Sequence, residues 1–231
     1  MENLTYNNVS FSTFNTFWDG SELFITPEKD VTFFEVPGKN GDLTISNNRF
    51  KNKSVPINCF IRENFKQNYS DLVNFLYSQE GYQRLETSKE PDIYMMAAFV
   101  SAIEPDTGAF LKYGNFTLNF NLKPQKWLKS GETGISISSG DTVNNPTLFN
   151  ALPLIEVNGT GTITINDSIL ELAQNTSTVY IDCEIQDAYE GTINRNSDLT
   201  ITNGFPVLKP GNNNVVVEGC SINLIPRWWR V

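Results

Sequence analysis

Asp182 and Glu184, in the segment IDCEIQD, are the residues whose types and spacing could carry chemistry. On an extended strand, residues two apart share a face, with about 7 Å between them. Two carboxylic acids suffice for glycosidic bond cleavage, and carboxylates also bind calcium. Alternating strands routinely place acids on a solvated face, so the sequence favours a solvated position for both carboxylates. A hydrolase site or a calcium site is the alternative. Glu104 and Asp106 flank Pro105 and predict a turn.

Other catalytic chemistry has no support in the composition. The chain contains no histidine, which excludes Ser-His-Asp and Cys-His arrangements and removes the commonest metal ligand. It contains neither of the glycine-rich phosphate-binding motifs, GxxxxGK[ST] and GxGxxG. Cys59, Cys183 and Cys220 lie far apart without a CxxC pair, which predicts buried reduced thiols. We therefore expect no catalytic residue, no metal site and no cofactor.

Trp228 and Trp229 are adjacent, so on a strand they point to opposite sides and cannot form one sugar-stacking platform. We expect one of them in the core or at a domain interface. The other, with the flanking arginines, is expected to cover a sheet edge or contact a partner. Trp18 and Trp127 are interpreted in the same way, as core or interface residues.

The charge of the chain argues against a nucleic-acid-binding protein. Its formal net charge is −9, whereas affinity for phosphates depends on lysine and arginine. The longest apolar run, Ile93–Val100, is far shorter than the ~20 residues of a membrane helix. The N-terminus has neither the basic start nor the apolar run of a signal peptide, so we expect the protein to be made and folded in a cytoplasm.

Most segments alternate between apolar and polar residues and are bounded by Gly, Pro or Asn, the pattern of half-buried antiparallel strands. In the clearest, Phe116–Leu122, the even-numbered residues are apolar. In Val179–Gln186 the odd-numbered residues are apolar, which places Asp182 and Glu184 together on the other face. Further strands are expected at Val31–Val36, Val55–Ile61, Thr162–Ile165 and Val215–Val217. The sequence therefore predicts a mainly β protein.

One segment has a helical period and predicts a single helix at about residues 70–80. Ser70 suits the N-cap, Asp71 the first turn and Gly81 the left-handed position after the last turn. One helical face carries an apolar stripe, which we expect to pack on the first sheet: Tyr69, Leu72, Val73 and Leu76, with Phe75 beside it.

At 231 residues the chain has room for one large β domain or two smaller ones. Gly, Ser and Asn become frequent within Lys123–Pro146, where the regular strands pause. We place a boundary near Ser130, which gives an N-terminal β-barrel or sandwich domain with one helix, 1–130, and a C-terminal domain, 131–231. The second part has the length and the turn spacing of a β-sandwich.

Two glycine-containing turns stand out. In FFEVPGKNGDL the turn Pro37–Gly41 predicts a hairpin in which Gly38 and Gly41 allow positive φ. In FPVLKPGNNNVVVEG, Phe205–Gly219, we expect two strands joined by a turn that begins at Pro210 and Gly211. Both turns set strand register, and the tip of either is a candidate contact in an assembly.

These segments resemble the distal tail proteins of siphophages. Members of that family carry a V-P-G-x-x-G loop near the N-terminus and end with an F-P-x-L-x-P-G-x-N segment and a basic, Trp-containing terminus. The segments NPTLFNALPLIEVNGTGTITIND and TVYIDCEIQDAYEG also resemble the family's C-terminal domain. The matches follow the family's order from Phe33 to Val231, nearly the whole chain.

The resemblance implies a structural virion protein of the phage tail tip, assembled in the bacterial host cytoplasm, and no enzyme. It implies an N-terminal domain that forms a hexameric hub ring, single or stacked, and a C-terminal galectin-like sandwich. The implied partners are the tail-tube protein, the tail-associated lysin or fibre protein, and receptor-binding or baseplate proteins, with DNA passing through the lumen without specific binding. The alternative is a carbohydrate-binding β-sandwich module without catalysis.

Overall fold

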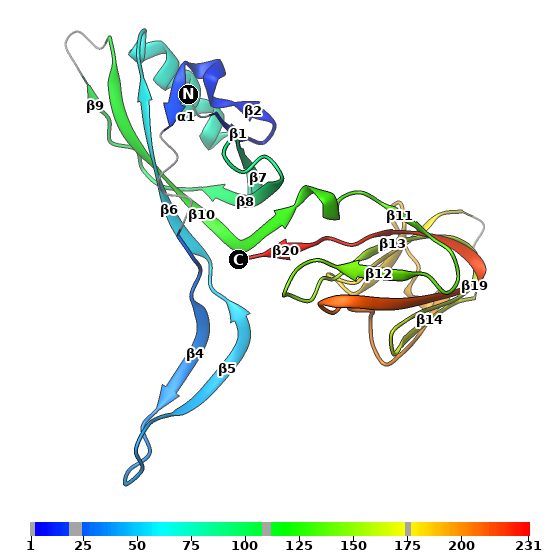
Figure 1. Ribbon diagram of the computed structural model, residues 1–231. Helices are drawn as coiled ribbons and strands as arrows, with labels where there is room; N and C mark the ends of the chain where they lie inside the picture. Colours follow the sequence, from blue (N-terminus) through cyan, green and yellow to red (C-terminus); the bar gives the residue numbers. More distant parts are fainter. Residues whose placement is uncertain (1–2, 19–24, 108–111, 174–176) are drawn as a thin grey trace. The chain divides into compact units, whose positions relative to one another are not determined.

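The computed structural model describes residues 3–18, 25–107, 112–173 and 177–231 (Figure 1). The chain forms two compact units, one from the N-terminus to Lys126 together with Val231, the other Trp127–Arg230. Strands dominate both units, which confirms the predicted mainly β fold. No helix among the described residues is long and apolar enough to cross a membrane.

The sheet of the first unit has the strand order β2-β1-β7-β8-β10-β6-β3, and β9 pairs with β10. These strands are β1 (Leu4–Tyr6), β2 (Val9–Ser10), β3 (Thr16–Trp18), β6 (Lys53–Ile61), β7 (Gln83–Thr87), β8 (Ile93–Phe99), β9 (Asp106–Thr107) and β10 (Gly114–Leu128). A short 3-10 helix, η1 (Phe11–Phe14), lies between β2 and β3 in the chain. The long antiparallel pair β6 and β10 runs in register from Gly114 opposite Ile61 to Leu122 opposite Lys53.

Alternation decides which face of this sheet is buried. The apolar residues of β10, from Phe116 to Leu122, are buried, as are Val55, Ile57, Cys59 and Ile61 of β6. The predicted strand 116–122 is therefore confirmed within a longer strand. The polar residues of both strands therefore lie on the opposite face.

The helix α1 (Phe65–Tyr77) packs on the buried face of this sheet through Phe65, Leu72 and Leu76. The predicted start at Ser70 is wrong, because the helix begins five residues earlier, after Asn64 at φ 50°. Gln67 and Asn68 donate their backbone N–H groups to the Asn64 carbonyl, so the first turn closes without a side-chain cap. The helix ends at Tyr77, with Ser78 as its C-cap, instead of near Gly81.

The strands β4 (Lys29–Phe34) and β5 (Leu43–Phe50) form a separate two-stranded antiparallel sheet, called the arm here. Figure 1 shows the arm running away from the sheet of its own unit, connected to β6. Its strands pair from Lys29 opposite Phe50 to Phe34 opposite Leu43.

The main sheet of the second unit has the order β11-β19-β13-β15-β16-β17. Its strands and those attached to it are β11 (Ile135–Ile137), β12 (Thr142–Asn145), β13 (Leu154–Ile165), β14 (Ser168–Leu172), β15 (Val179–Asp182), β16 (Asp187–Glu190), β17 (Ile193–Asn194), β18 (Leu199–Thr202) and β19 (Gly211–Ile225). The short strand β20 (Trp229–Arg230) pairs with β10 instead. The long strands β13 and β19 pair along most of their length, with a bulge between Gly159 and Thr162. A separate core fills this unit, with Ile155, Ile163 and Leu224 among its fully buried residues.

Two predicted strands of this unit are wrong in part. The strand β15 stops at Asp182, because the Asp182 side chain accepts hydrogen bonds from the backbone N–H groups of Glu184 and Ile185 and turns the chain. Ile185, predicted to be on the apolar face, is therefore exposed. In the segment before Pro210 only Leu208 makes a bridge, to Ala151, so no regular strand precedes that turn.

The cysteines are free thiols, with Cys59 and Cys183 buried as predicted. Burial raises the pKa of Cys183 to about 12, so this thiol stays protonated. Cys220 is partly exposed, which corrects the expectation for that residue.

Candidate functional site

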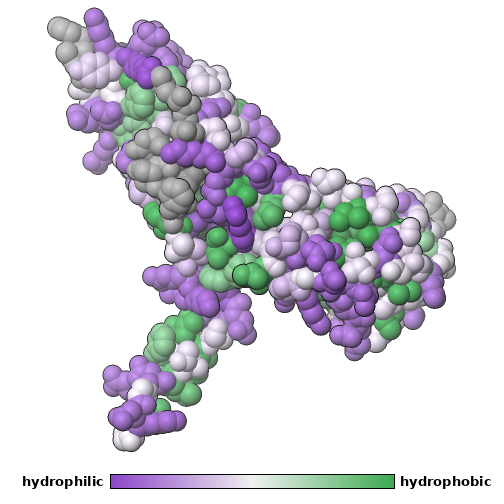
Figure 2. Space-filling model, in the orientation of Figure 1, coloured by the Kyte–Doolittle hydropathy of each residue, from purple (hydrophilic) through white to green (hydrophobic). Residues whose placement is uncertain are grey.

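The arm exposes large apolar side chains. Phe33 is 64% exposed, Phe34 49%, Leu43 56% and Ile45 49%. Figure 2 shows apolar surface along the arm. Phe34 lies directly opposite Leu43, and Ile45 lies two residues further along β5, so these three side chains share one face. An isolated two-stranded hairpin is marginally stable in water, and an exposed apolar patch marks an interaction surface.

The tip of the arm is the turn predicted from PGKNG. Gly38 and Gly41 adopt φ values of 78° and 82°, which L side chains rarely adopt, so glycine is required at both positions. The backbone N–H of Lys39 donates to the carbonyl of Val36. Pro37 is exposed with the rest of the turn. The tip is therefore an ordered turn that presents its side chains to solvent.

A buried lysine lies where the arm joins β6. Lys53 is 6% exposed and donates from Nζ to the Ile25 carbonyl at 2.8 Å, which ties the segment before the arm to the start of β6. Burial, with the nearby Lys126 charge, lowers the pKa of Lys53 to about 8, although Glu90 acts in the opposite direction. Lys126 in turn donates to Glu90 at 3.0 Å. This cluster fixes the base of the arm.

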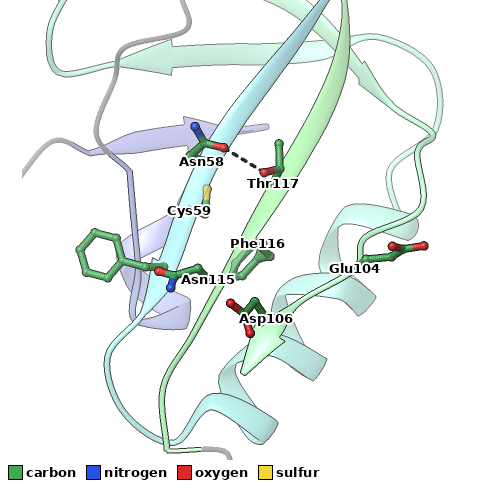
Figure 3. A pocket seen from close by; sticks show the side chains of 8 residues that line it. Asn58, Cys59, Glu104, Asp106, Asn115, Phe116 and Thr117 are labelled. Atoms are coloured by element: carbon green, nitrogen blue, oxygen red, sulfur yellow. Dashed lines mark hydrogen bonds between the residues drawn. The ribbon is translucent and has the colours of Figure 1, made fainter. Parts of the chain in front are cut away.

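A groove of about 420 Å³ crosses the polar face of β6 and β10 beside β9 (Figure 3). Its lining residues are Asn58, Cys59, Phe60, Glu104, Asp106, Asn115, Phe116 and Thr117. Asp106 lies opposite Asn115 in the sheet, and Asn115 lies opposite Phe60. Thr117 Oγ1 donates to Asn58 Oδ1 at 2.9 Å. The groove thus combines amides and carboxylates with aromatic side chains.

The groove does not offer the ligand set of a metal site. Among the described residues, no three His, Cys, Asp or Glu side chains are grouped so that they could hold an ion. A basic group lies at the same end of β6, where the Arg62 guanidinium is 5.5 Å from the Phe60 ring centre and 5.0 Å from that of Phe17. The groove therefore has carboxylates at one side and a cation near its aromatic wall.

The carboxylates Asp182 and Glu184 both contact Arg227. Asp182 accepts from this guanidinium at 2.7 and 2.8 Å, and Glu184 accepts at 3.5 Å. Burial acts to raise the pKa of Asp182, but the hydrogen bonds and charge of Arg227 and two backbone N–H donors outweigh it, so the pKa is lowered. The predicted solvated face is wrong for Asp182, which is buried in this ion pair. The pair anchors the C-terminal segment.

The PGNNN segment also differs from its prediction. Gly211 has φ 81°, but it begins β19, so the three asparagines belong to the strand instead of the turn. Asn213 is fully buried and donates to the carbonyls of Lys209, Gly211 and Val143 at 2.8, 3.0 and 3.2 Å. Its Oδ1 accepts from Lys209 N and Asn166 Nδ2, both at 2.8 Å. A fully satisfied buried amide of this kind was missed, because a run of asparagines is typical of turns.

The two adjacent tryptophans point in different directions. Trp228 is buried in the core of the second unit. The Trp229 ring stacks on Phe149 with the ring centres 4.5 Å apart, and its Nε1 donates to the Asn150 carbonyl at 2.9 Å. Trp18 is buried in the core of the first unit. A partner contact for the Pro37, Pro210 or Trp229 regions stays a prediction.

Comparison with known proteins gives the family. The model of the phage tail protein RIFT-related domain matches residues 3–122, about half of the chain. No curated protein matches. A crystal structure of Dit (gp 19.1) of phage SPP1 has a similar fold, with a TM-score of 0.79 over 100% of both chains at 12% sequence identity. That protein is described as a paradigm of hub adsorption apparatus in phages that infect Gram-positive bacteria. The chain therefore belongs to the phage tail proteins with a RIFT-related domain, and it has the fold of a siphophage distal tail protein.

Proposed function

We propose that this chain is the hub of a siphophage tail tip: six copies form a closed ring that joins the tail tube to the distal tail proteins. The observation that carries this proposal is the exposed apolar arm. Full burial of one large apolar side chain stabilises by about 1.5–3 kcal/mol relative to exposure. A hairpin that leaves Phe33, Phe34, Leu43 and Ile45 in water has much to gain from a second surface.

A neighbouring copy supplies that surface most simply. An arm that packs on a different part of the next subunit makes a head-to-tail contact, and repetition of such a contact gives a ring when the rotation closes. The similarity of the fold to a hub protein supports a closed ring over an open filament. Isolated rings can also stack in pairs.

A ring of this kind acts through its shape and has no need of a catalytic group. The genome would leave the virion through its lumen, and the net charge of −9 favours passage of DNA without adhesion if acidic side chains line the channel. The ring would contact the tail-tube protein on one side and a tail-associated lysin or fibre protein on the other. The second unit is then free to carry receptor-binding or baseplate proteins.

Light scattering on a sizing column tests the assembly. We expect a species of about 156 kDa, six times the 26.0 kDa of one chain, or twice that mass for stacked rings. The double variant Phe34→Ser/Leu43→Ser should shift the protein to smaller species, because it removes apolar surface that the interface would bury.

The control is Ile193→Ser on β17 in the second unit, since Ile193 and Leu43 are both 56% exposed in the monomer. We expect this control to assemble like the unaltered chain. A wild-type protein that stays monomeric at all accessible concentrations would count against self-assembly through the arm, and so would full assembly of the Phe34→Ser/Leu43→Ser variant.

A further inference from the structure

We propose that the tip of the arm binds in the groove at β9 of the next copy, with the Lys39 ammonium between Glu104 and Asp106. This inference rests on the proposed ring and deepens it, because it names the acceptor site for the arm.

Arm and groove lie at opposite ends of the same strand. The arm joins β6 just before Lys53, whereas the groove is lined by residues from Asn58 to Phe60 near the other end. Phe60 follows Lys53 by seven positions along the strand, about 23 Å at ~3.3 Å per residue. The arm also points away from its own sheet (Figure 1). The groove of the same chain is therefore out of reach, and a second copy must supply the partner.

The charges of the two surfaces are complementary. Lys39 is the single lysine or arginine between Asp30 and Asn48, and it lies at the extreme end of the arm. The groove carries the carboxylates of Glu104 and Asp106, both exposed and therefore accessible to an incoming ammonium group.

The flanking charges of the tip define its orientation. Glu35 and Asp42 lie just before and after the turn, so the arm is accepted by a carboxylate-lined groove only when Lys39 leads. Arg62 lies over the Phe60 ring, at the groove end of β6. Its positive charge can attract either Glu35 or Asp42 of the arm tip.

The groove walls suit a hairpin turn. The residues of the turn from Pro37 to Asp42 are exposed, and the groove offers the side-chain amide of Asn115 as a hydrogen-bonding partner. Phe60 gives it an apolar wall beside this amide, whereas the Phe116 side chain is buried in the core. A volume of about 420 Å³ lies in the range of sites that take small ligands or a few residues of a partner.

Zero-length carbodiimide cross-linking tests the contact directly, because it joins a lysine amine to a carboxylate only when the two touch. Chains labelled with ¹⁴N and ¹⁵N are dissociated, mixed and reassembled, then cross-linked and digested. We expect mixed-isotope peptides that join Lys39 to Asp106 or Glu104. Lys39→Arg keeps the charge, so it should keep the assembly and lose the cross-link.

Charge reversal tests the energetic role. Lys39→Glu should raise the dissociation constant of the assembly by about tenfold or more, since like charges then meet at the contact. Combining Lys39→Glu with Glu104→Lys and Asp106→Lys in one chain should restore assembly to within about threefold of the unaltered protein. The control is Lys209→Glu, an exposed lysine of the second unit that changes the net charge equally.

The outcomes separate this inference from the proposed ring. If the Phe34→Ser/Leu43→Ser variant dissociates but Lys39→Glu assembles normally and no Lys39 cross-link forms, the inference is wrong and the ring stands. If the wild-type chain never assembles, both fail. Saturable binding of a cell-wall saccharide that is lost in Asn115→Ala and Asp106→Asn, with no effect of Lys39→Glu on assembly, would assign the groove to a sugar and overturn the inference.

Discussion

Replacement of the buried Asn213 by alanine is expected to destabilise the second unit strongly. The side chain holds the start of β19 against three other segments: it donates to carbonyls of Val143, Lys209 and Gly211 and accepts from Lys209 N and Asn166 Nδ2. Alanine leaves these partners inside the protein without a replacement. Each buried hydrogen bond contributes about 1 kcal/mol net, and each orphaned buried polar group costs about 1–3 kcal/mol.

Because some of the released carbonyls can find water near the exposed Pro210, we expect a total loss of roughly 3–5 kcal/mol. At 3 kcal/mol the melting temperature of a unit of this size should fall by roughly 12–24 °C. Urea denaturation with hydrogen-exchange mass spectrometry gives the loss of stability and locates it in the second unit. The chain has two units, so the local exchange data decide the outcome if unfolding has more than one transition.

The neighbouring Asn212 supplies a matched control. It is exposed and its Oδ1 accepts from Asn144 Nδ2 at 2.8 Å, so Asn212→Ala should cost less than about 0.5 kcal/mol. Both variants must be compared at equal protein concentration, because assembly also contributes to apparent stability. Equal stability of the two variants would refute the argument that the Asn213 network holds this end of the strand.

Two further predictions concern pH. The pKa of Asp182 is lowered in the folded protein, so its ion pair with Arg227 contributes stability above the unfolded pKa that is lost as pH falls through the folded pKa. Asp182→Asn should remove that acid-side dependence in urea titrations, and an unchanged pH profile would contradict it. The pKa of Lys53 is lowered from 10.5 to about 8, so between these two pH values the Lys53 amine is protonated in the unfolded state but largely neutral in the folded state. The contribution of Lys53 to the free energy of unfolding should therefore rise with pH in that range. Lys53→Met should abolish the rise, and persistence of the rise in this variant would mean that another group causes it.

The strands were the most predictable part of the fold. Alternation in Phe116–Leu122 and Val55–Ile61 identified the buried face of both strands, because the period of two is a local property of an extended chain. The helix was found but its start was wrong. Asn64 uses a left-handed backbone conformation instead of a side-chain cap, so the sequence signal at Ser70 was misleading.

The candidate site was predictable only at the turns. The glycines at 38 and 41 were expected to allow positive φ, and both have it. The composition of the arm gave no indication that its apolar residues would be left uncovered, because an alternating strand looks the same whether or not a second layer packs on it. Exposure is decided by the rest of the chain, and within the described part of the chain Phe34 and Leu43 stay about half exposed.

The sequence by itself determined the chemistry that the protein lacks and the structure it forms locally. A chain without histidine cannot build a histidine-dependent site, and residues that alternate along a strand sort themselves by their own geometry. The tertiary structure decided which distant groups meet: Asp182 with Arg227, Asn213 with Asn166, and Asp106 with Asn115, its partner in the sheet. The physical reason is that burial and pairing depend on contacts between residues far apart in the chain. The local period of a sequence contains no information about such contacts.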